Sequence, residues 1–338
     1  MPMPSRYARQ VILPEFGEAA QERLLGSRVV VTGCGALGGA VATQLVRAGV
    51  GRVVVVDRDV VESGNLQRQI LFDDDDAAAA LPKAEAAAAR LRRANPDVLV
   101  DAVVADVDRG NVEGLVDGAD VVVDGADNFE LRILVNEVCV KLGVPFVHGA
   151  VSGTYGVQWT ILPGDSACYG CLVEEAPPPG AVPTCETTGV LGPTVLAVAA
   201  LQAAEALKVL TGNRARVRRT LLSFDMWTGS RAEVAVHRNP ACPVCGLRRF
   251  DHLEGRKGAR TTVLCGRDSV QVSAGRGVAL EDVAASLPPG TEVKANRYLV
   301  RFEAEGLTVT LFADGRAIVQ GTADATRARA VLARWVGA

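Results

Sequence analysis

The sequence contains few aromatic residues. They make up 4% of its 338 residues, whereas 49% of the residues are hydrophobic and 35 are glycine. A core with so few rings must be built mostly from Val, Ala and Leu. This composition is typical of a parallel sheet that is covered on both faces, because its strands are unbroken apolar runs in the sequence. The length allows one large domain and a small one.

Other absences narrow the class of protein. No uninterrupted apolar run of the length of a membrane span occurs, and the residues from Met1 to Tyr7 contain no apolar segment of a secretory signal. The net charge of −3 gives no support for nucleic-acid binding. The chain has no G-x-x-x-x-G-K-S/T motif, which excludes a P-loop enzyme. We therefore expect a cytoplasmic protein that binds neither nucleic acid nor membrane.

A glycine-rich turn follows the first strong apolar run, within Val29–Gly39. A helix-prone segment and a second apolar run come next, and that run ends in Asp57. This pattern predicts a nucleotide-binding β-α-β unit. Gly33 permits the tight turn, Gly35 lets backbone approach a phosphate, and Gly38 lets helix and strand pack closely. Asp57 is placed to bind ribose hydroxyls. The motif alone leaves the nucleotide open, with NAD as the default interpretation.

Apolar runs and helix-prone segments continue to alternate through the first 250 residues, which predicts a Rossmann-like, doubly wound α/β sheet. Further strands are predicted at 98–104, 121–123, 146–151, 155–162, 220–224 and 232–236, and helices at 84–93, 129–142 and 193–210. The tail predicts a small α+β domain with one strand, a helix, three more strand-like runs and a last helix. The predicted domains are therefore a Rossmann-like domain at 1–250, a linker at 251–261 and the small α+β domain at 262–338.

Polar residues cluster at or just past the predicted carboxyl ends of strands, where open α/β sheets bind ligands. They are Asp57, Asp59, Asn65, Arg68, Lys83 and Asp127. A triphosphate requires such cations together with a carboxylate for Mg²⁺, whereas NAD does not. Each residue also has a structural interpretation: a surface salt bridge for Arg68, a solvated helix start for Lys83, and the cap of the helix from Phe129 for Asp127. The acidic run Asp73–Asp76 is expected to be a solvated loop.

Two C-x-x-C pairs occur among the eight cysteines. Four thiolates can complete a tetrahedral Zn²⁺ site, and each pair can present two sulfurs to one ion. The pairs are so far apart in sequence that the fold would have to bring them together, which makes the expected site a structural one. A redox motif or unrelated thiols are the alternatives. The predicted ligands are Cys168, Cys171, Cys242 and Cys245.

Several motifs occur together and in one order: Arg6-Tyr7-x-Arg9-Gln10, the Gly33 turn, Asp57-x-Asp59, Asn65-Leu66-Gln67-Arg68-Gln69, Pro82-Lys83, Asp127-Asn128-x-x-x-Arg132 and the two cysteine pairs. In this, residues 5 to 250 resemble the ThiF/MoeB/HesA family, bacterial relatives of the ubiquitin-activating E1 enzymes. The resemblance implies an E1/ThiF-type adenylation domain. It further implies ATP-dependent adenylation of the C-terminal Gly-Gly carboxylate of a ubiquitin-like sulfur carrier, with release of pyrophosphate. Thiamin, molybdopterin and tRNA-thiolation pathways all fit, with a cysteine desulfurase as a possible sulfur donor.

The resemblance also implies roles for individual residues. Asp57 binds the ribose with help from Asp59, and Asp127 binds Mg²⁺ beside Asn128. The phosphates are contacted by Asn65, Arg68 and Lys83, with the glycines 33, 35 and 38 beneath them. Arg9 reaches into the site of a second subunit, so a homodimer is expected.

The sequence does not decide the role of Cys185, and it leaves several alternative functions. Cys185 is either a nucleophile that forms a thioester or persulfide-derived link, or an ordinary loop thiol; Cys265 has no assigned role. The tail is too short for a rhodanese domain. Protein conjugation of the E1 kind, an NAD-dependent oxidoreductase and a non-catalytic zinc-containing interaction protein are the alternative functions.

Overall fold

The chain divides into two compact units in the computed structural model, which describes residues 5–177, 185–257, 263–264, 269–273 and 277–336. One unit contains residues 1–177 and 189–257, and the other contains residues 178–188 and 258–338. Residues 251 to 257, at the start of the expected linker, belong to the first unit. Phe250, Asp251 and Leu253 are buried there.

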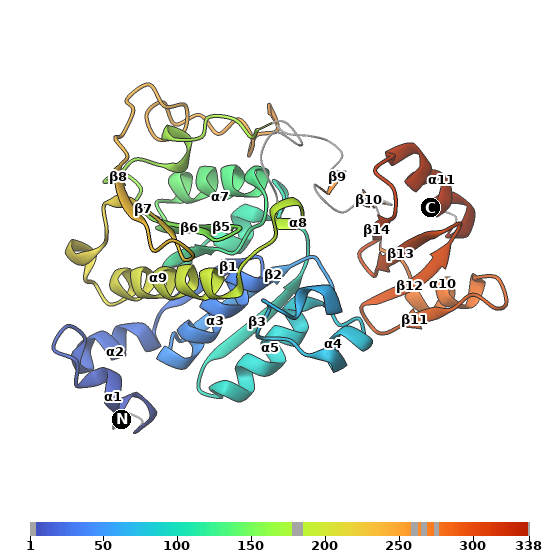
Figure 1. The fold of residues 1–338 in the computed structure, drawn as a ribbon, viewed down its shortest axis with the longest axis horizontal. Coiled ribbons are helices and arrows are strands. Elements are labelled where there is room, and N and C mark those ends of the chain that lie inside the picture. The colour runs from blue at the N-terminus through green and yellow to red at the C-terminus, as the bar shows by residue number, and fades with distance from the viewer. Residues whose placement is uncertain (1–4, 178–184, 258–262, 265–268, 274–276, 337–338) are drawn as a thin grey trace. The chain divides into compact units, whose positions relative to one another are not determined.

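The first unit is built on an eight-stranded sheet with the order β3-β2-β1-β4-β5-β6-β7-β8 (Figure 1). The first five strands in this order are parallel, and the last three are antiparallel. Val29, Val30 and Val31 have no exposed surface, as expected for a strand covered on both faces. The strands are β1 Arg28–Thr32, β2 Arg52–Asp57, β3 Leu99–Val104, β4 Val121–Asp124, β5 Phe146–Ser152, β6 Tyr155–Ile161, β7 Thr220–Asp225 and β8 Arg231–Ala235.

Helices cover both faces of this sheet, so the predicted doubly wound α/β fold is confirmed (Figure 1). One face is covered by α3 Ala36–Ala48, α5 Lys83–Ala94 and α9 Gly192–Leu210, and the other by α6 Val112–Val116 and α7 Phe129–Leu142. The shorter helices of this unit are α1 Ala8–Val11, α2 Gly17–Leu25 and α4 Asp74–Ala78, whereas α8 Cys185–Thr188 belongs to the second unit. Strand order reverses between β1 and β4, which places the crevice for a ligand at the carboxyl ends of these strands.

Helix α9 is long and apolar enough to cross a membrane by length and composition, and it is the one described helix that meets this test. However, 56% of it is buried inside the protein. It packs against α3 and the middle of the sheet, and Val198, Ala199 and Ala206 are completely buried. A core helix of this kind passes the same test.

The acidic run is a helix start and not the predicted loop, although Asp73, Asp74 and Asp75 are exposed to solvent as expected. Asp73 caps α4 with a capping box, in which its side chain accepts from the Asp76 backbone and the Asp76 side chain accepts from the Asp73 backbone. Asp76 is buried and lies 2.5 Å from the Arg90 guanidinium. The carboxylates therefore stabilise a helix start, where negative charge is favourable.

The second unit has a six-stranded sheet of order β11-β12-β13-β14-β10-β9. Its helices α10 Leu280–Ser286 and α11 Ala325–Trp335 contribute to one apolar core with Val300, Phe302 and Val309. Four strands lie between these helices, not the three predicted, because the short and mostly exposed β11 gives no alternating pattern. The strands are β9 Val263–Leu264, β10 Ser269–Ser273, β11 Val293–Ala295, β12 Leu299–Ala304, β13 Leu307–Phe312 and β14 Arg316–Gln320.

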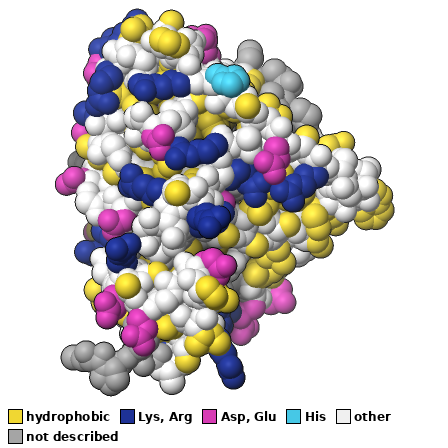
Figure 2. Space-filling model, turned by 90° about the vertical axis from the view of Figure 1, so that its left-hand side faces the viewer, with side chains coloured by type: hydrophobic (Ala, Val, Ile, Leu, Met, Phe, Trp, Pro, Cys, Tyr) yellow, Lys and Arg dark blue, Asp and Glu magenta, His cyan; other side chains and the backbone are white. Residues whose placement is uncertain are grey.

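Charges of both signs are interspersed on the face shown in Figure 2. Near β7 and β8 they form ion pairs: Arg218 contacts Glu233 at 2.8 Å, and Arg219 contacts Asp165 at 2.7 Å. The Arg-rich segment before β7 is thus partly neutralised by carboxylates of its own unit.

Candidate nucleotide site and cysteine cluster

The glycine turn brings the loops after β1 and β4 into direct contact. Gly33 has a φ of +93°, and a Cβ there would lie 2.5 Å from the carbonyl oxygen of Gly125. A Cβ on Gly38 would lie 1.9 Å from the Gly33 oxygen, so α3 can begin this close to the strand only without a side chain at that position. Around Gly35 there is more room, and α3 has no side-chain cap. Its first N–H groups are therefore available to an anion.

Asp57 ties the end of β2 to this turn. Its Oδ2 accepts from the Cys34 N–H at 2.7 Å, and its Oδ1 accepts from the Asp59 N–H at 2.7 Å. Burial raises the pKa of Asp57, and the nearby Lys83 offsets part of this effect. Each carboxylate oxygen has a second lone pair, so Asp57 can still accept from ribose hydroxyls.

Lys83 is a buried cation at this edge of the sheet. Its Nζ donates to Asp59 Oδ2 at 3.0 Å, and its backbone N–H donates to the Asp59 carbonyl at 2.9 Å. Only 3% of its side chain is exposed, so it is not the solvated helix start of the structural interpretation. An ammonium has three donors and can contact a phosphate oxygen together with a carboxylate.

The segment from Ser63 to Gln69 lies over the start of α3. Arg68 donates to Asn65 Oδ1 at 2.7 Å, and it forms no ion pair with any carboxylate among the described residues, unlike the surface salt bridge of the structural interpretation. The amide of Gln69 is the nearest group to a Cβ at Gly35, at 3.6 Å. Gln69 is 4% exposed, and its Oε1 has no hydrogen-bond partner in the part of the chain that the structure describes. A buried acceptor beside an uncapped helix start fits a site for a polar ligand.

Asp127 is exposed in the loop after β4 and does not cap α7, contrary to the structural interpretation of the sequence. Asn128 is the cap: its Oδ1 accepts from the Leu131 N–H at 2.8 Å, and its Nδ2 donates to Asp127 Oδ1 at 3.0 Å. The charge of Asp127 also acts on Arg58. Burial opposes the charge of Arg58, but Asp106, Asp59, Asp127 and Asp57 raise its pKa. The carboxylates predicted from two separate motifs, Asp57 and Asp59 in one and Asp127 in the other, thus all act on one guanidinium, which the sequence did not single out.

A buried polar cluster behind the Asp127 loop was also missed. Asp124, the last residue of β4, has no exposed surface, and its Oδ2 lies 3.0 Å from Arg132 Nε and 2.6 Å from His148 Nδ1. Arg132 belongs to the quoted motif but carried no assigned role. Asp124 and His148 lie within apolar runs of the sequence that predict buried strands. The one signal for them was the presence of a titratable residue in such a run, because a buried titratable group needs a polar partner.

Arg9 is not part of this constellation within one chain. Gln10 Nε2 donates to the carbonyl of Ala48, the last residue of α3, and Tyr7 packs against Gly49. Helix α3 has 13 residues, so Arg9 lies about 20 Å from the glycine turn at the other end. Its side chain is exposed.

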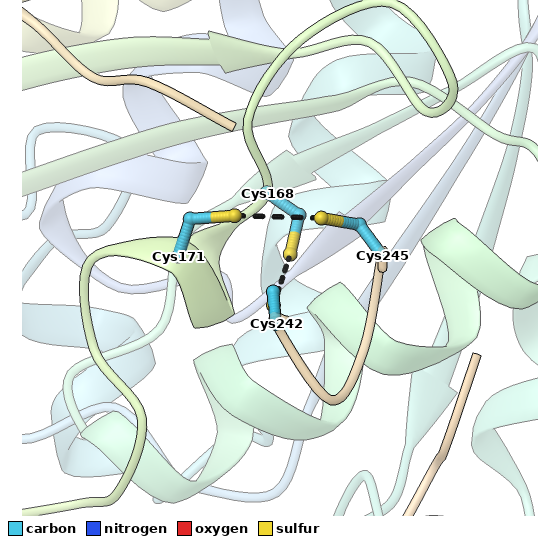
Figure 3. Close-up of side chains that lie close together, drawn as sticks. All are labelled: Cys168, Cys171, Cys242 and Cys245. Atoms are coloured by element: carbon cyan, nitrogen blue, oxygen red, sulfur yellow. Dashed lines mark hydrogen bonds between the residues drawn. The ribbon is translucent and has the colours of Figure 1, made fainter. Parts of the chain in front are cut away.

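The two C-x-x-C pairs meet on the α7 side of the sheet (Figure 3). All four Sγ atoms lie within 4.8 Å of one another, with Cys168 3.7 Å from Cys242 and Cys171 3.4 Å from Cys245. These distances exclude disulfides and are close to the edge of about 3.8 Å expected for thiolates around one Zn²⁺. Burial, and then the neighbouring thiols, raise the pKa of Cys168. A divalent cation supplies the positive charge that four clustered thiolates need.

The cysteines outside this cluster differ in burial and in whether the structure describes their side chains. Cys34 and Cys139 are completely buried, and burial raises the pKa of both thiols, which suits inert packing residues. Cys185 begins the short helix α8, but its side chain lies outside the described part of the chain, as do residues 178–184 and Cys265.

A doubly wound sheet with a glycine turn, cations and carboxylates at its switch point, and a four-cysteine cluster on one face defines a nucleotide-binding protein with an E1-like fold. The ThiF family profile matches residues 7–244, and the chain belongs to the ThiF family.

Relatives with curated names cover most or all of the chain. The chain is 44% identical to the sulfur carrier protein ThiS adenylyltransferase of Bacillus subtilis strain 168, over 99% of this chain and 100% of that protein. It is 49% identical to the SAMP-activating enzyme E1 of Haloferax volcanii, over 74% of this chain and 91% of that protein. Among solved structures, E. coli MccB with ATP is 25% identical with a TM-score of 0.63, over 71% of this chain and 74% of that chain.

Proposed function

We propose that the protein is an adenylyltransferase that activates the C-terminal Gly-Gly carboxylate of a ubiquitin-like sulfur carrier with ATP. The observation that carries this proposal is the full-length similarity to a ThiS adenylyltransferase, together with the glycine turn and the start of α3, which has no side-chain cap. In the reaction, a carboxylate oxygen of the carrier forms a bond to the α-phosphorus, and the bond from that phosphorus to the β-phosphate oxygen breaks. Pyrophosphate leaves with the electron pair, and no proton is transferred.

Both reactants are anions, so positioning and charge neutralisation are the main contributions of the protein. The ribose hydroxyls are proposed to bind Asp57, which is already fixed by two backbone donors. Lys83 and Arg68 are proposed to contact the phosphates, held in place by Asp59 and Asn65 respectively.

The donor set of the Asp127 loop fits Mg²⁺. A carboxylate oxygen is the ligand that this ion prefers, and the exposed Asp127 is oriented by Asn128. When bound, Mg²⁺ supplies positive charge to the phosphate oxygens. The cysteine cluster is proposed to hold one Zn²⁺ that joins the segments after β6 and β8, and metal analysis of the purified protein tests this directly.

The carrier is proposed to approach over the same edge of the sheet. Tyr155 begins β6 and pairs with Asp225 at the end of β7, directly beside Met226 and Trp227. Tyr155 is 58% and Trp227 78% exposed. Exposed apolar side chains next to a catalytic edge are typical of a surface that a protein substrate covers. A homodimer with Arg9 supplied in trans is proposed from the distance between Arg9 and the glycine turn of its own chain.

Protein conjugation is the second candidate function, because one relative is named an E1 enzyme. Both functions begin with the same adenylate. No relative reported above is named an oxidoreductase, so the NAD interpretation has no support beyond the glycine motif.

Intact-mass analysis of a Gly-Gly-terminated carrier incubated with the protein and MgATP tests the proposal. An adenylate on the carrier supports it, provided that a carrier without its last glycine stays unmodified. An unmodified carrier with every Gly-Gly protein tried contradicts it.

A further inference from the structure

The buried cluster of Asp124, Arg132 and His148 lies directly behind the loop that carries Asp127. Asp124, Arg132 and His148 are 0%, 8% and 5% exposed, and Asp124 Oδ2 lies 3.0 Å from Arg132 Nε and 2.6 Å from His148 Nδ1. Burial opposes the charge of Asp124, but Arg132 and His148 outweigh it and hold the pKa of Asp124 below its usual range. Burial lowers the pKa of His148. The cluster is therefore one carboxylate, one guanidinium and a neutral imidazole that donates Nδ1–H to the carboxylate, with no net charge.

The contacts of this cluster converge on the backbone of one residue, Ala126. Its N–H donates to Asp124 Oδ1 at 2.8 Å, and its carbonyl accepts from Arg132 Nη2 at 2.6 Å. Both polar groups of the residue before Asp127 are thus held by buried side chains. Gln202, from α9 on the other face of the sheet, donates to the Asp124 carbonyl at 2.8 Å.

The far side of Asp127 is held independently by Asn128, which caps α7 and donates to the Asp127 carboxylate. Arg132 lies in the first turn of the same helix, and its positive charge also acts on Tyr169, between the first two cysteines of the cluster, where it opposes the rise that burial causes in the pKa of Tyr169. A carboxylate that must bind a metal in an exposed loop needs such support, because the loop has no other means of fixing its direction.

We propose that Arg132, supported by Asp124 and His148, is the positioning residue that fixes the Ala126 backbone and so aims the Asp127 carboxylate at the magnesium ion of the bound nucleotide. This inference rests on the proposed function, because it assigns Asp127 to the metal. A purely structural arginine would stabilise the fold without setting the affinity for magnesium.

The test titrates Mg²⁺ into full-length protein at a fixed ATP concentration and follows ATP binding by calorimetry. The Mg²⁺ concentration that gives half of the maximal ATP binding is then compared between the wild-type protein and its variants. Arg132→Lys keeps the charge but cannot reach both Asp124 and the Ala126 carbonyl with one planar fork. We expect it to raise the half-saturating Mg²⁺ concentration about tenfold or more, in the range usual for loss of a metal ligand's support. Nucleotide binding without Mg²⁺ should stay within about twofold of wild type.

Arg92→Lys is the matched control. Arg92 also uses Nε and Nη2 together, on the Val100 carbonyl at 3.0 and 2.6 Å, but it lies away from the Asp127 loop. Arg92→Lys should lower stability without changing the Mg²⁺ dependence.

An unchanged Mg²⁺ dependence in folded Arg132→Lys overturns the inference if Asp127→Asn shifts the Mg²⁺ dependence. If Asp127→Asn leaves it unchanged as well, the assignment of the metal in the proposed function has failed instead.

His148→Gln provides a second route should Arg132→Lys not fold. The flexible glutamine amide holds the Asp124 carboxylate less firmly than the imidazole does, so the support of Arg132 is weakened but not removed. A smaller rise in the half-saturating Mg²⁺ concentration supports the inference, and wild-type Mg²⁺ dependence contradicts it.

Discussion

Asp127 and Asn128 are neighbours with different tasks. The side chain of Asn128 caps α7, whereas the Asp127 carboxylate is exposed and contributes nothing to the helix start. From the sequence, either residue could have been the cap, because Asp and Asn are both strong N-caps. The register of the helix decides between them, and it is a property of the packed structure.

Asn128→Ala should therefore lower the free energy of unfolding by about 1 kcal/mol, the usual value of a lost N-cap. Asp127→Ala should change it by less than about 0.5 kcal/mol, because the side chain is exposed, yet abolish adenylation. Urea unfolding and carrier adenylation, measured on the same preparations, check both values. A large loss of stability in Asp127→Ala would show that the residue has a structural role.

His148 makes stability depend on pH in a defined direction. Its pKa is lowered by burial in the folded protein, with Asp124, Arg132, the Phe146 ring and Tyr169 as its neighbours. The unfolded chain therefore binds the proton first as the pH falls below about 6.5, and stability is lost in that direction. This one group contributes at most about 1.4 kcal/mol per pH unit.

His148→Gln should flatten the slope of the free energy of unfolding between about pH 6.5 and pH 5, whatever its effect on stability at neutral pH. Denaturant titrations at intervals across this range measure the slope. Equal slopes in the variant and the wild-type protein would mean that His148 titrates normally in the fold.

At the scale of elements, the sequence indicated the type and order of most helices and strands in the first unit. Helix α7 Phe129–Leu142 matches its prediction at both ends. Long apolar runs and helix-prone segments are local signals, so they can be identified without the fold. The capping box at Asp73 and the pairing of Lys83 with Asp59 were missed, because each depends on partners that only the folded chain brings close.

The start of α3 provides a test at this scale. Gly38→Ala places a methyl group 1.9 Å from the Gly33 carbonyl oxygen, so α3 must shift away from the loops that hold the nucleotide. We expect a loss of about 1–3 kcal/mol in stability together with weaker ATP binding. Thermal unfolding and ATP titration measure the two effects.

Gly64→Ala is the matched control, because no atom lies within 4 Å of a Cβ at Gly64 and its φ is not positive. Its stability should stay within about 0.5 kcal/mol of wild type. If Gly38→Ala proves as mild as Gly64→Ala, the close approach of α3 to the Gly33 turn is not required.

At the scale of the whole molecule, the fold brings most residues of the scattered motifs to one edge of the sheet: Asp57, Asp59, Asn65, Arg68, Lys83 and Asp127, but not Arg9. That they bind a nucleotide there stays a prediction. Strand order explains both outcomes: parallel strands bring their carboxyl ends to one edge, whereas α1 is anchored at the far end of α3. The sequence alone does not show the distance between Arg9 and the glycine turn of its own chain. From this distance we propose that Arg9 acts in the site of a partner subunit.

Mixing two inactive variants tests this proposal. Arg9→Ala and Asp127→Ala should each lack activity. After subunit exchange, about a quarter of all sites should be intact, because each mixed dimer has one site free of both substitutions. Carrier adenylation by the mixture measures this recovery. No recovery despite confirmed exchange would place Arg9 outside the catalytic site.

The most direct test of the central claim is the exchange of labelled pyrophosphate into ATP. We predict exchange that requires MgATP and a carrier ending in Gly-Gly, that disappears when the last glycine of the carrier is removed, and that is lost in Asp127→Ala. Exchange without a carrier, or none with any Gly-Gly carrier from a protein shown to bind ATP, would contradict the account.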